Sequence, residues 1–111
     1  MALHHAASGE LINIAPLGAK LGDAKTAALF KSAHLEVIQM VLPAGKLVRP
    51  HQVPGEITLQ CLEGRLELDI PGAMRSLSAG QLVCLAGGVP HAMTAMEDTA
   101  LLMTILLQPA T

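Results

Sequence analysis

PAGKLVRPHQVPGEITLQCLEG (residues 43–64) and AGQLVCLAGGVPHAMTA (residues 79–95) share one pattern. Each contains a Gly, a short apolar run, a Pro/Gly turn, one His and a further apolar run. The two histidines are His51 and His91. Repetition of short strand-like runs around such turns is typical of β-structure. The pattern therefore predicts two matching halves of one β-fold that bring both histidines to a single pocket.

Short strand-like runs recur along the whole chain, separated by Gly and Pro, whereas helical signals are scarce. These runs occupy residues 11–14, 35–42, 46–49, 56–62, 65–70, 74–77, 81–86, 91–95 and 99–107. Regular spacing of this kind predicts an all-β sandwich or barrel. Residues 23–31 could carry a helical turn, although their alanine content is weak evidence for one.

Apolar and polar residues alternate in several of these runs, as expected for strands with one buried face. Leu66, Leu68 and Ile70 alternate with charged residues, and Glu63-Gly64 before them suits a hairpin turn. Alternation predicts that six side chains share one interior: Ile57, Leu59, Leu66, Leu68, Ile70 and Met93.

Two runs depart from alternation because they are apolar on both faces, residues 35–42 and residues 100–107. A strand that is apolar on both faces needs cover on both. We expect a second copy of the chain to supply the outer cover, which would make the protein a homodimer. Residues 10–20 folding over the same face are the alternative.

Composition argues against several classes of partner. The formal net charge is −2 and there is no basic run, so we expect no nucleic-acid binding. Phe30 is the only aromatic residue, which excludes ring stacking of sugars or bases in a pocket.

Location follows from the apolar segments and the cysteines. The N-terminal residues lack the basic start and long apolar core of a secretory signal, and residues 100–107 are too short to span a bilayer. Cys61 and Cys84 lie within apolar runs, where buried, reduced thiols are expected. We therefore expect a cytoplasmic protein that does not enter a membrane.

The spacing of the two stretches resembles that of the cupins, small RmlC-like jelly-roll barrels also described as double-stranded β-helices. In the first cupin motif, Gly45 and His51 are separated by five residues and Gly64 is in the closing position. In the second motif, Gly80, Gly88 and His91 are in register, while Ala86 and Ala95 replace the usual Pro and Asn.

The resemblance covers about residues 34–107 and implies a cupin jelly-roll barrel. A chain of 111 residues is long enough for one domain. We expect residues 1–33 to form an N-terminal arm and first strands, and residues 34–111 to form the barrel core.

The resemblance also implies a metal site, which this chain does not complete. Cupin metals are usually held by two histidines and a glutamate of the first motif and by the histidine of the second. His51 and His91 are kept, but Val53 and Ile57 occupy the positions of the other two ligands. Two imidazoles fall short of the three protein ligands of a catalytic zinc site or an iron triad. A divalent Zn, Ni, Mn or Fe ion stays an open possibility as cofactor.

Three other residues are candidates for a further ligand. Glu56 is adjacent to the lost position, but strand alternation points it to the opposite face unless the turn before it rotates it back. Cys61 shares the face of Ile57 but lies about 13 Å further along, at about 3.3 Å per residue. His34 opens an earlier strand at an unknown depth. Glu56 is the doubtful third ligand.

The predicted pocket combines two polar groups with an apolar wall, as small-molecule sites commonly do. Its predicted ligand-binding residues are His51, His91, Val53, Ile57, Leu59, Met93 and Arg49. Arg49 lies at the expected barrel mouth, where it could bind a carboxylate or remain a surface charge. The first hypothesis is a small-molecule binding protein, and the alternative is a metal-dependent oxygenase or isomerase. A structural domain whose histidines only satisfy backbone groups is the third.

Overall fold

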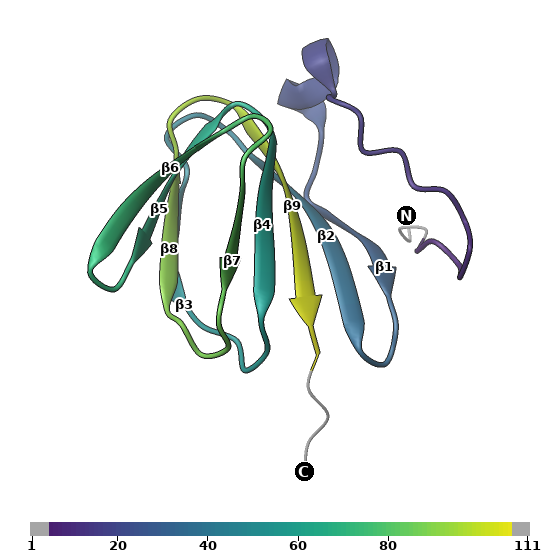
Figure 1. The fold of residues 1–111 in the computed structure, drawn as a ribbon. Helices are drawn as coiled ribbons and strands as arrows, with labels where there is room; N and C mark the ends of the chain where they lie inside the picture. The colour runs from purple at the N-terminus through teal and green to yellow at the C-terminus, as the bar shows by residue number, and fades with distance from the viewer. Residues whose placement is uncertain (1–4, 108–111) are drawn as a thin grey trace.

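Nine β-strands and one short 3₁₀ helix form the regular structure of residues 5–107, the part of the chain that this computed structural model describes (Figure 1). The helix is η1 (Gly18–Asp23). The strands are β1 (Ala27–Lys31), β2 (Leu35–Leu42), β3 (Leu47–His51), β4 (Ile57–Glu63), β5 (Arg65–Ile70), β6 (Ala73–Ser78), β7 (Leu82–Leu85), β8 (His91–Ala95) and β9 (Thr99–Leu106). The all-β prediction is confirmed.

The strands form two antiparallel sheets that face each other as an open jelly-roll barrel. One sheet has the order β1-β2-β9-β4-β7 and the other the order β3-β8-β5-β6. The barrel is not closed, because no strand of one sheet pairs with a strand of the other within the described residues. Each sheet takes strands from both halves of the chain, so one interior is built from both sequence stretches.

The interior is an apolar core between the two sheets. Leu59, Leu66, Leu68 and Leu101 have no exposed surface, and Ile57 and Met93 are almost fully buried. Ile70 is partly buried and packs against the same cluster. The predicted inward rows are therefore confirmed. Full burial of one such side chain contributes about 1.5–3 kcal/mol relative to exposure.

Two local expectations at the N-terminal side are wrong. Residues 11–14 form no strand, and the Leu11 side chain is 96% exposed. Residues 27–31 are strand β1 rather than a helical turn, because they pair antiparallel with β2 in the register Ala27–Gln39. Sheet pairing overrides a weak helical preference.

The N-terminal arm is tied to the sheet at two points. The Ala6 amide donates a hydrogen bond to the Leu29 carbonyl in β1. Further along, the amides of Leu17 and Gly18 donate to the Glu63 carboxylate at 2.6 and 3.3 Å. These contacts hold the entry to η1 against the end of β4. Residues 1–4 and 108–111, which belong to the expected arm and barrel core, lie outside the described residues.

Strands β2 and β9 are apolar on both sides, and a row of uncharged residues forms the outer face of their sheet. Ile38 and Met40 pack against the core, whereas Leu35 and Leu106 pair on the opposite side. Cys84 also lies outside and is exposed, so its predicted burial is wrong. Val83 and Leu85 pack toward the core, which leaves the residue between them facing outward. The described residues include no helix that meets the length and hydropathy needed to cross a membrane.

The crossing from β4 to β5 depends on Gly64. Its φ is +90°, and a Cβ there would collide with the Asp98 carbonyl and with Thr99. The fully buried Thr99 hydroxyl lies 2.7 Å from the Glu97 carbonyl and accepts the Arg65 amide at 3.2 Å. At Gly64 the chain passes from one sheet to the other, and it contacts the turn before β9 at this point.

Gly64→Ala should destabilise the protein more than Gly72→Ala. Gly72 also has a positive φ, +77°, but a Cβ there meets nothing within 4 Å. Gly72→Ala should cost only the backbone strain of about 1–2 kcal/mol, whereas Gly64→Ala adds the collision. Urea unfolding of both variants measures the difference. Equal losses of unfolding free energy in the two variants would contradict the close approach at Gly64.

Candidate functional site: a buried and an exposed histidine

The structure brings the two motif histidines together where β3 ends and β8 begins. His51 and His91 are paired residues of these antiparallel strands. Their ring centroids are 4.4 Å apart, with the ring planes inclined at 54°. The register shifts between Val48 and His51, so β3 carries one residue more than β8 at this point. Pro50 lies in the shift, where its missing N–H cannot join the ladder.

The two imidazoles have different environments. His51 is exposed, and its Nδ1 is 3.5 Å from the Arg49 carbonyl. His91 is only 2% exposed, and its Nδ1 is 3.1 Å from the Val89 carbonyl. A carbonyl can only accept, so this contact assigns the proton of neutral His91 to Nδ1. Its Nε2 is then an acceptor, and it is buried without a hydrogen-bond partner in the described part of the chain.

Burial also lowers the pKa of His91 below its ordinary value. Desolvation of the charged ring is the largest cause, and the nearby His51 charge acts in the same direction. The hydrogen bond to the Val89 carbonyl opposes both by favouring the protonated form. The His91 ring is therefore neutral at neutral pH, with a lone pair on Nε2.

The apolar residues predicted for the pocket belong to the core. Ile57, Leu59 and Met93 are buried, and Val53 is partly buried against the same cluster. Arg49 is exposed. The interior therefore presents hydrocarbon where a metal-binding cupin presents a carboxylate and a further imidazole.

Glu56 does not join the histidine pair. Its side chain is exposed and lines a surface depression with Thr58, Cys84 and Thr104 of the outer sheet face. Its carbonyl accepts the Leu106 amide at 2.9 Å, which fixes the chain at this edge. The alternation argument that pointed Glu56 outward agrees with this position. His34 is also exposed, in the turn before β2.

Glu36 is the one charged residue of strand β2. It lies in the same alternating row as Ile38 and Met40, and it is partly buried. Its partner on β9 is Ile105 and its partner on β1 is Lys31. Among residues 5–107 it does not complete a metal-binding group with the histidine pair.

The residues present do not fit a metal ion held by protein ligands alone. Among residues 5–107, no group of three or more His, Cys, Asp or Glu side chains is arranged to hold one. The pair supplies two imidazoles, and Glu36 and Glu56 add no third ligand in this arrangement. Catalytic zinc and non-haem iron sites need three.

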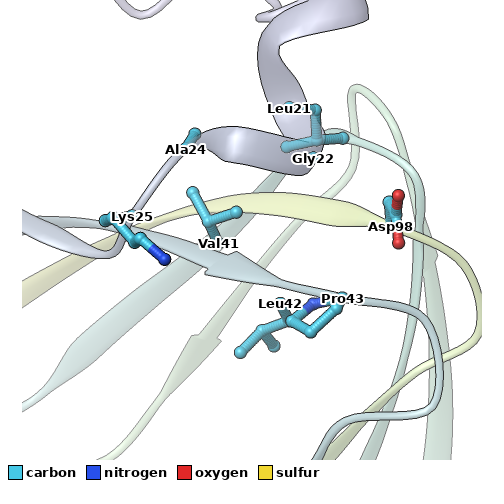
Figure 2. Close-up of a pocket in the computed structure, with 8 residues that line it drawn as sticks. All are labelled: Leu21, Gly22, Ala24, Lys25, Val41, Leu42, Pro43 and Asp98. Carbon is cyan, nitrogen blue, oxygen red and sulfur yellow. The ribbon is translucent and has the colours of Figure 1, made fainter.

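Two depressions lie near opposite ends of the strands. One, of about 290 Å³, reaches His91 but not His51 and is lined by Pro50, Asp69, Ile70, Pro71, Gly72, Pro90, His91 and Ala92. The other, of about 220 Å³, lies beneath η1 (Figure 2). There the Asp98 carboxylate already accepts the Ala44 amide at 2.8 Å.

Solved structures with the same fold include proteins of different kinds. A conserved protein of unknown function from Streptococcus pyogenes has a TM-score of 0.74 at 20% identity, covering 99% of this chain and 100% of the other. The DMSP lyase DddQ from Ruegeria pomeroyi has a TM-score of 0.70 at 27% identity, covering 88% and 54%. The oxalate decarboxylase of Bacillus subtilis, described with Mn(II) centres, has a TM-score of 0.65 at 20% identity, covering 72% and 23%.

Curated proteins provide no match to this chain. The sequence pattern of the cupin domain, however, matches residues 38–107. The match contains both histidine motifs and every strand from β3 to β8, and it spans more than half of the chain. The chain therefore belongs to the cupin family.

Proposed function

We propose that this cupin binds a small, largely apolar molecule at the His51–His91 pair, without a metal ion held by protein ligands alone. The observation that carries the proposal is the buried His91 Nε2, which has no hydrogen-bond partner among the described residues. A buried polar atom left unpaired costs about 1–3 kcal/mol. Native structures contain few such atoms, because protein groups, ordered water or bound ions and ligands pair with them.

The surroundings of the pair support an apolar ligand. Ile57, Leu59 and Met93 are buried in the core, and Met93 follows His91 in the same inward row of β8. The neighbouring His51 is exposed, so the pair joins a surface position to a buried one. A small apolar molecule with one polar group suits this change from exposed to buried surroundings. Small-molecule sites usually combine an apolar lining with a few polar groups.

A metal-dependent enzyme is the second candidate, favoured by the shared fold with the oxalate decarboxylase whose structure is described with Mn(II) centres. In this chain the two imidazoles would need water or substrate to complete the shell of a Zn, Ni, Mn or Fe ion. Such a site would bind weakly, because the ligand number sets much of the affinity.

Metal titration separates the two candidates. Calorimetry with Zn²⁺, Ni²⁺ and Mn²⁺ should give weak binding to the native protein. Val53→His with Ile57→Glu should raise affinity by more than the roughly 10- to 100-fold effect of groups that only orient metal ligands. Val53→His alone is the milder variant, because Ile57 is buried. Native binding as tight as that of the restored variant would reveal a third ligand, with Glu56 and His34 the first to test.

The neutral state of His91 predicts a pH dependence of stability. Its folded pKa lies below the value of about 6.5 in an unfolded chain, so the unfolded chain takes up the proton first as pH falls. The stabilisation is complete above about pH 6.5 and is lost below it, by up to about 1.4 kcal/mol per pH unit until the folded pKa is reached.

Urea unfolding between pH 7.5 and 5 measures this effect. His91→Gln should flatten the profile relative to the native protein, whereas His34→Gln, which alters an exposed histidine, should leave it unchanged. An unchanged profile in His91→Gln would show that His91 is not buried as a neutral ring.

We also propose that a second copy covers the outer face of the five-stranded sheet. Apart from Glu56 at one edge, this face carries uncharged residues from alternating positions: Leu35, Val37, Thr58, Gln60, Leu82, Cys84, Leu102, Thr104 and Leu106. Leu82 and Leu106 are 57% and 40% exposed in one chain. Two copies related by a twofold axis would bury this face against itself, at about 25 cal/mol per Å² of apolar surface.

Leu106→Glu should therefore convert the dimer to a monomer, because it places a carboxylate in the interface. Leu47→Glu is the matched control, since Leu47 is 60% exposed on the other sheet. Light scattering at micromolar concentration gives the mass of each variant. A native protein that is already monomeric there, or a Leu47→Glu variant that dissociates equally, would contradict the proposal.

A further inference from the structure

We infer that the molecule bound at this site is a neutral hydrogen-bond donor: an alcohol, phenol or N–H compound whose donor group is accepted by His91 Nε2. This inference rests on the proposed function and narrows it to one chemical class. It excludes carboxylates and phosphates as the group that contacts His91.

The first step is the direction of the hydrogen bond. The Val89 carbonyl, 3.1 Å from Nδ1, holds the ring proton on that nitrogen. Nε2 of the neutral ring can then only accept. The ring cannot turn its donor toward a ligand without leaving the Val89 carbonyl unpaired. A bound group must therefore bring the proton.

The second step is that the described chain offers no donor of its own. No described residue hydrogen-bonds to Nε2. His51 is the nearest candidate by ring position, at 4.4 Å between centroids, but no hydrogen bond joins the two rings. Its own Nδ1 is directed to the Arg49 carbonyl instead. The donor has to come from outside the described residues.

The third step concerns the charge of that molecule. An anion would direct oxygen lone pairs at the lone pair of Nε2, which repels them. It would also lose hydration beside Met93, the next residue in the inward row of His91, and it would lie near Asp69, which lines the depression that reaches His91. Burial of an unpaired carboxylate is far more costly than burial of a hydroxyl group that is hydrogen-bonded. A neutral donor on an apolar body avoids both costs.

Three probes of similar size test the inference: p-cresol, 4-methylanisole and 4-methylbenzoate. The first donates a hydrogen bond, the second has the same oxygen without its proton, and the third is an anion at pH 7. Ligand-observed NMR gives all three affinities. The chain has no Trp and no Tyr, so p-cresol fluorescence gives an independent reading. We expect p-cresol to bind about tenfold more tightly than 4-methylanisole, and 4-methylbenzoate to bind least.

The variant His91→Phe keeps a ring of similar shape without the acceptor, so the preference for p-cresol should disappear. His34→Phe, at an exposed position, should retain it. Nitrogen-15 NMR of the native protein provides a reading that needs no variant. Nε2 of His91 should have the shift of an unprotonated nitrogen, and that shift should move when p-cresol is added.

The outcomes separate this inference from the proposed function. Equal binding of p-cresol and 4-methylanisole, or a preference that persists in His91→Phe, overturns the donor inference but leaves a small-molecule site. Tighter binding of 4-methylbenzoate than of the other two probes also overturns the donor inference and leaves a small-molecule site. A protonated Nε2 also overturns the inference. If none of the three binds at millimolar concentration and the Nε2 shift does not move, both proposals fail.

Discussion

A single apolar interior, shared by two sheets, is the constraint on which the structure depends. Side chains such as Leu59, Leu66 and Leu101 are fully withdrawn from water there, and they come from strands of both sheets. Strand geometry allows every second residue to reach this interior. Each strand therefore has one row of residues that must be apolar, and any polar side chain in such a row needs a partner.

His91 is a buried polar residue in one of these apolar rows, and the proposed function depends on it. It occupies the first position of β8, in a place where Met93 and Ala95 contribute hydrocarbon to the core. Val89 satisfies one ring nitrogen and nothing in the described chain satisfies the other. The core tolerates a neutral imidazole because a charged one would cost more to bury. We propose that a site accepting a proton donor follows from that compromise.

The apolar residues at the metal-ligand positions change the site in two ways. Val53 and Ile57 remove two donors, and they also extend the core toward the histidines. Ile57 is 3% exposed, so it fills space rather than leaving an empty coordination position. Val53 and Ile57 therefore leave two imidazoles at the motif positions and add hydrocarbon to the core.

Much of the fold was predictable from the sequence, because period-two alternation and Gly/Pro turns act locally. The runs at residues 35–42 and 65–70 match β2 and β5, and the spacing of both motifs identified the family. The same local reasoning failed at residues 11–14, which form no strand, and at residues 27–31, which pair with the next strand, β2. Alternation could also have placed Cys84 outside, because it lies between Val83 and Leu85, which face the core.

The sequence alone identified the two motif histidines that lie side by side, but it did not determine how their exposure differs. Both motifs have the same form, yet only tertiary structure exposes His51 and buries His91. The depth of a side chain and the partner of each ring nitrogen depend on atoms brought together by sheet packing. Desolvation and hydrogen bonding act over a few ångströms in space, whereas a motif records only distances along the chain.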